Sequence, residues 1–205
     1  MDQFEIDHRA YEAINEGSAT LANLVLSHLR AANRFDPPTI LAGIGFVVGD
    51  TLLRVSGEDL EELQPGEPVE NPWIDANGQR LGILMAGWLT AQGLKVMPPG
   101  FPSNDQARGE MAQITPAYEP AQLASELRPS ITRLMDSRDL GFEDRVLMAS
   151  LTAVRLLIGL REAIGPEEGA HIIMQAIAIA GRHAPMKKAD EEVPPALSMM
   201  SLAGA

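Results

Sequence analysis

The chain has 205 residues, of which 45% are hydrophobic, 21% charged and 4% aromatic, so it is long enough to bury a core and is most simply one domain. Its formal net charge of −12 argues against nucleic-acid binding, because contacts to phosphates need clustered lysine and arginine. It contains no cysteine, which excludes disulfides, thiolate catalysis and zinc–thiolate sites.

The sequence shows no signal for secretion or membrane insertion. Residues 1–5 lack the basic region and the apolar run of a signal peptide. The two longest apolar stretches, residues 40–48 and 172–180, are shorter than the roughly 20 residues that a membrane span needs. We therefore expect a cytoplasmic protein that associates with neither a membrane nor a nucleic acid.

The composition favours helices. The core must be built from Leu, Ile, Val, Ala and Met, and three of these are strong helix formers. We predict an all-α fold, a bundle of about six main helices with two long irregular loops. In this prediction residues 1–184 form the single bundle domain, and residues 185–205, which are rich in proline and charge, form a mobile C-terminal tail.

The first predicted helix spans residues 11–35. Its apolar residues recur at steps of three and four, and it ends before Pro37 and Pro38. His28 lies on this apolar seam, so its side chain points to a neighbouring helix. It is either a hydrogen-bonded core histidine or a functional residue.

The second predicted helix, residues 39–55, carries Gly43, Gly45 and Gly49. Each glycine weakens a helix by roughly 1 kcal/mol relative to alanine, which indicates that another group packs against the backbone. Gly45 and Gly49 lie one turn apart on one face. That face either packs closely on another helix, within the chain or across a dimer, or leaves room for a ligand.

Residues 57–79 are acidic and rich in turn signals, of which Asn71-Pro72 is one. Such acids usually form a solvated face, but those between residues 58 and 70 could also capture a basic partner. Trp73 is a large aromatic residue in this polar segment. We expect it to dock on the core or on a partner.

The middle of the chain is predicted to alternate between helix and loop. Residues 80–92 return to a helix with Trp88 on its apolar side, and residues 95–120 are irregular and contain five prolines. Loops this long are uncommon in compact domains unless they bind or cover something. Residues 121–140 form the next helix, which Pro129 should kink or divide.

Residues 142–184 read as two apolar helices joined at Gly165-Pro166. Glycine can end one helix in the left-handed conformation, and proline suits the first turn of the next. The first helix has two apolar rows, and the second is apolar nearly all round. We therefore place this hairpin at the centre of the bundle.

Sequence motifs for nucleotide binding, for serine hydrolases and for zinc proteases are missing from the chain. Glu-x-x-His pairs occur twice, at Glu5 and His8 and at Glu168 and His171. Di-iron and di-manganese bundles use two such pairs with two further glutamates, so these four residues are candidate metal ligands. The further ligands would come from four glutamates: Glu12, Glu110, Glu126 and Glu143. Acids at helix starts are also expected for the helix dipole alone.

The prediction that best fits these patterns is a non-enzymatic helical protein of interaction or assembly, with a protein partner or itself as partner and a homodimer as the expected form. No cofactor is expected. The alternative is a metal-dependent or small-molecule-binding bundle that uses a divalent metal. Four residues are candidates for contact with a ligand or a partner: Gly45, Gly49, Trp73 and Trp88.

Overall fold

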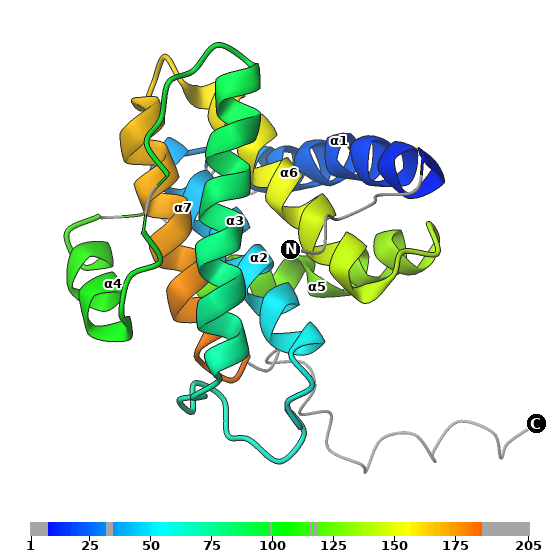
Figure 1. Cartoon of the computed structure of the whole chain (residues 1–205), viewed down its shortest axis with the longest axis vertical. Coiled ribbons are helices and arrows are strands. Elements are labelled where there is room, and N and C mark those ends of the chain that lie inside the picture. The colour runs from blue at the N-terminus through cyan, green and yellow to red at the C-terminus, as the bar shows by residue number, and fades with distance from the viewer. Residues whose placement is uncertain (1–7, 32–34, 99, 115, 117–118, 186–205) are drawn as a thin grey trace, which may run out of the picture.

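The computed structural model describes residues 8–31, 35–98, 100–114, 116 and 119–185. This part of the chain forms seven helices and no β-strand, which confirms the predicted all-α fold (Figure 1). The helices are α1 (His8–Ala31), α2 (Pro37–Val55), α3 (Pro72–Ala91), α4 (Asn104–Met111), α5 (Pro120–Asp136), α6 (Phe142–Leu160) and α7 (Pro166–Gly181).

Proline occupies the first position of α2, α3, α5 and α7, where its missing N–H removes no helical hydrogen bond. Two of these starts are also capped by a side chain. Asp36 Oδ2 accepts a hydrogen bond from the backbone N–H of Thr39 at 3.0 Å, and Asn71 Oδ1 accepts one from that of Trp73 at 2.8 Å. The sequence around both positions therefore fixes where α2 and α3 begin.

The start of α3 differs from the prediction. Residues 72–79 were expected in a loop, but they are helical, because Asn71-Pro72 acts as an N-cap and first helical residue rather than as a turn. Trp73 thus belongs to the first turn of α3. Pro129 does not divide the helix, since α5 continues through it as one element. The expected left-handed glycine was wrong, since Gly165 has φ −56°.

The centre of the bundle is the pair α2 and α7, which pack on each other more extensively than any other two helices. The predicted central hairpin is therefore only half right, since α7 is central but its main neighbour is α2 and not α6. α6 packs on α1 and α2, α5 on α2, and α4 on α7. α3 stands at the front in Figure 1 and contacts α6 and α7 along one side.

One described helix, α2, is long and apolar enough to cross a membrane by length and composition. In the bundle 72% of its apolar window is buried, so α2 is a core helix of the described structure.

The predicted tail is almost entirely outside the described residues. The described chain ends at Pro185, shortly after α7, where the backbone N–H of Val69 donates to the carbonyl of Arg182 at 2.8 Å. This contact ties the end of α7 to the loop that precedes α3.

Candidate functional site

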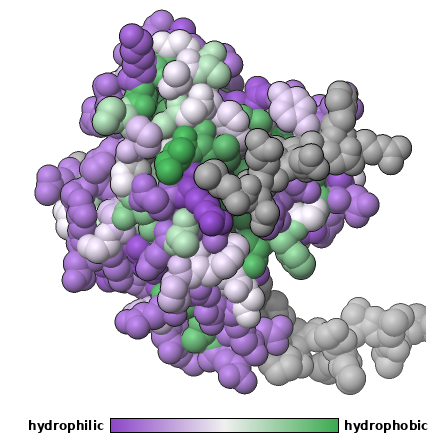
Figure 2. Space-filling view, viewed as in Figure 1, coloured by the Kyte–Doolittle hydropathy of each residue, from purple (hydrophilic) through white to green (hydrophobic). Residues whose placement is uncertain are grey.

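An apolar groove lies between α3, the last turns of α2 and the first turns of α6. Its volume is about 340 Å³. Figure 2, which views the molecule as in Figure 1, shows hydrophobic side chains gathered over α3 on an otherwise mainly polar face. The groove is lined by residues from these three helices: Leu52, Val55, Trp73, Asn77, Arg80, Leu81, Ile83, Leu84, Trp88, Glu143, Val146 and Leu147.

Both tryptophans of the chain line this groove, although they lie near opposite ends of α3. Trp73 is 39% exposed and Trp88 is half-buried. The fifteen residue steps between them correspond to about 22 Å along a helix axis. The structure therefore brings two of the predicted contact residues into one elongated apolar surface.

The exposed side of α3 carries large apolar side chains, which are unusual on a helix side that faces water. Ile83 is 56% exposed, and Trp73, Ala76, Arg80 and Gly87 are exposed with it. These five positions follow one another at steps of three and four, the spacing of a helix–helix seam. A Cβ atom added at Gly87 would meet nothing within 4 Å, so a second backbone could approach closely there.

One cation and one anion line the groove. Arg80 stands on the α3 wall and Glu143 on the α6 wall, and both are exposed. Within the described part of the chain neither residue makes an ion pair. Other described arginines, including Arg128 and Arg182, do pair with carboxylates. The groove is thus neutral overall although the chain is acidic.

Gly45 and Gly49, the other two predicted contact residues, are buried under α7 of the same chain. A Cβ at Gly45 would lie 2.8 Å from the carbonyl oxygen of Ile173, and one at Gly49 would lie 2.6 Å from that of Ile177. The close approach that these glycines permit is made by α7, so this face has no room for a ligand or a second copy.

The structure brings only some of the predicted metal ligands together. His171 Nε2 lies 2.6 Å from Glu110 Oε2, so α7 and α4 bring together two candidate ligands. Glu168 is exposed one turn before His171. Glu5 and the side chain of His8 lie outside the described residues. Among the side chains that are described, no group of three or more His, Asp or Glu could hold a metal ion.

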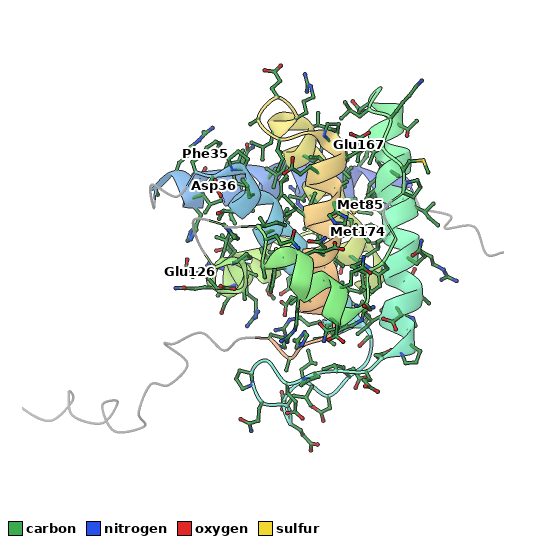
Figure 3. The ribbon with its side chains drawn as sticks, turned by 90° about the vertical axis from the view of Figure 1, so that its left-hand side faces the viewer. Phe35, Asp36, Met85, Glu126, Glu167 and Met174 are labelled. Atoms are coloured by element: carbon green, nitrogen blue, oxygen red, sulfur yellow. The ribbon has the colours of Figure 1, made fainter. Side chains whose placement is uncertain are left out.

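A polar cluster joins α4 to α7 around Glu110. Its carboxylate accepts hydrogen bonds from Gln106 at 3.0 Å and from the buried Gln175. The hydrogen bond from Gln106 lowers the pKa of Glu110 below its usual value. The charge of His171 and the hydrogen bond from that residue lower it further, and desolvation of the carboxylate opposes these effects. Figure 3 looks onto α4 with α7 behind it.

His183, just beyond α7, makes the second contact with α4. Its Nδ1 donates to the carbonyl oxygen of Ile179 at 2.6 Å, and its Nε2 accepts from the Arg108 guanidinium. Burial lowers the pKa of His183, and the charges of Arg108 and Arg182 lower it further. The ring is therefore neutral and holds the Nδ1–H tautomer at neutral pH.

The sequence prediction missed the parts of the groove that come from Arg80, Ile83 and Leu84. Their three- and four-residue spacing was visible as one helical side, but spacing alone does not tell which side remains uncovered. No protein-family model matches the chain, and no curated protein or solved structure is detectably similar to it.

Proposed function

We propose that the protein acts in protein–protein interaction or assembly, without catalysis of its own, and that the groove beside α3 is its binding surface. The observation that carries this proposal is the uncovered apolar side of α3, where Trp73 and Ile83 remain exposed next to a groove with an apolar floor. Contiguous exposed apolar surface on a folded domain usually marks a site of contact with another molecule.

The shape and the residue types of the groove suit a helix as ligand. Helix-binding grooves have an apolar floor and take apolar side chains at steps of three and four along the bound helix. Tryptophan is among the residues that contribute most to binding at interfaces. Trp73 and Trp88 at the two ends of the groove would contact such a helix over about four turns.

Photo-crosslinking tests this function. A photoreactive phenylalanine derivative is placed at position 83 in the groove and, as a control, at position 97, where Met97 is 83% exposed and outside the groove. The cells that naturally make the protein are irradiated, and the adducts are analysed by mass spectrometry. We expect a protein adduct from position 83 that disappears when Leu84→Glu is added. Equal yields from both positions would contradict the proposal.

A metal-dependent bundle is a second candidate function, because the structure joins two of its predicted ligands, His171 and Glu110. The test is the metal content of protein purified without chelator, measured beside a His171→Ala variant. Stoichiometric iron, manganese or zinc that is lost in the variant would support this function, and a folded, metal-free wild-type protein would exclude it.

A further inference from the structure

The groove beside α3 offers an apolar floor, a seam along one helix and one charge of each sign. We propose that its occupant is a second copy of the same chain, related by a two-fold axis, with Arg80 of each copy paired with Glu143 of the partner subunit. This inference rests on the proposed function of the groove, since it names the partner of that surface.

The seam of α3 supports a helix–helix contact between copies. Trp73, Ala76, Arg80, Ile83 and Gly87 follow the alternating three and four steps with which two helices interlock. Ala76 and Gly87 are small and exposed, so they leave space for the larger side chains of a facing helix. A two-fold interface needs one surface that is complementary to itself, and a seam of alternating large and small residues meets this condition.

Charge complementarity identifies the second copy as the occupant. The groove carries one cation on the α3 wall and one anion on the α6 wall, and in the described chain both lack an ionic partner. A two-fold axis through the contact brings the cation of each copy to the anion of the other. The dimer then contains two such ion pairs, each charge is paired once, and two chains of net charge −12 meet over a neutral surface.

Charge reversal in the full-length chain tests this pairing. Arg80→Glu gives a groove with two anions, and Glu143→Arg gives a groove with two cations, so neither variant can pair with itself. Each reversal should weaken dimerisation at least about tenfold, because like charges then face each other at both contacts. Both positions are exposed, so circular dichroism should show unchanged folding.

The decisive experiment mixes the two charge-reversal variants, Arg80→Glu and Glu143→Arg. A mixed dimer places opposite charges at both contacts, so we expect an equimolar mixture to form heterodimers while each variant alone remains monomeric. Sedimentation velocity with one variant fluorescently labelled measures this directly. A monomeric wild-type chain, unchanged dimerisation of both single variants, or a mixture that does not associate would each overturn the inference.

The same experiments separate this inference from the proposed function. An adduct from position 83 that contains a different protein, together with a monomeric wild-type chain, would keep the interaction function and reject self-association. An adduct that joins two copies of the chain would support both. If position 83 gives no adduct above the control, the interaction function itself fails.

Discussion

Trp73 and Trp88 stand near the two ends of α3 and line one groove that no described segment of the chain covers. α3 keeps part of its apolar side at the surface, where Ile83 is 56% and Trp73 39% exposed. An exposed apolar surface of this kind lowers solubility unless another molecule covers it. It is the basis for the proposal that the protein is a self-associating helical bundle.

A charge at position 83 should abolish association without disturbing the fold. Ile83→Glu places a carboxylate in the middle of the apolar seam, where it would be desolvated by a partner. In the isolated chain the residue is 56% exposed, so the free energy of unfolding should change by less than about 0.5 kcal/mol. Light scattering and urea unfolding measure the two effects. Met97→Glu is the matched control, and equal loss of association in both variants would contradict the placement of the interface.

The glycines of α2 and α3 should respond to alanine in opposite directions. Gly49→Ala would place a Cβ 2.6 Å from the carbonyl oxygen of Ile177, so we expect destabilisation by about 1–3 kcal/mol. Gly87→Ala meets open space and should stabilise the helix by up to about 1 kcal/mol. Urea unfolding at a concentration where the chain is monomeric measures both. Similar effects in the two variants would contradict the close packing of α2 on α7.

The contact between α4 and α7 should weaken in acid. The pKa of His183 is lowered in the folded chain, so the unfolded chain binds more protons and stability rises with pH. This contribution is complete above the usual value of 6.5 and is lost as the pH falls below it. Urea unfolding between about pH 7 and pH 5 measures the slope, which His183→Gln should flatten. An unchanged slope in the variant would show that another group titrates.

The N-cap of α3 should contribute measurably to stability. Asn71 Oδ1 accepts a hydrogen bond from the Trp73 N–H, and its Nδ2 donates to Glu58 Oε1 at 2.7 Å. Asn71→Ala removes both hydrogen bonds, and we expect it to lower the free energy of unfolding by about 1 kcal/mol. It should weaken the association of two chains by more than this amount, because the first turn of α3 carries Trp73. Asn71→Ser keeps a capping acceptor but, like alanine, loses the hydrogen bond to Glu58, and serves as control. If it destabilises as much as alanine does, capping is not the cause.

The helices could be predicted from the sequence where the local spacing of apolar residues determines them. The three and four steps of apolar residues led to helices that overlap six of the seven described ones, all but the short α4, and Asp36-Pro37 marked the junction of α1 and α2 correctly. Figure 3 shows this junction at Phe35 and Asp36. The start of α3 was missed because an Asn-Pro pair is equally a turn signal and a helix start, and only the packing of the following residues decides between them.

The site was predictable only in part, because it depends on contacts between distant segments. Trp73 and Trp88 were named from their residue type, yet spacing could not show that α7 covers Gly49 while Ile83 stays uncovered. Contacts between residues far apart in the sequence could not be predicted for the same reason. His28 was expected to face another helix, but its partner, Glu126 of α5 at 2.9 Å, follows only from the fold.

Sedimentation velocity of the full-length wild-type chain over a wide concentration range tests the central claim most directly. The account predicts a reversible change from monomer to dimer as concentration rises, with the emission of the two groove tryptophans shifting to shorter wavelength as they become covered. A chain that stays monomeric at every concentration, with unchanged tryptophan emission, would contradict it.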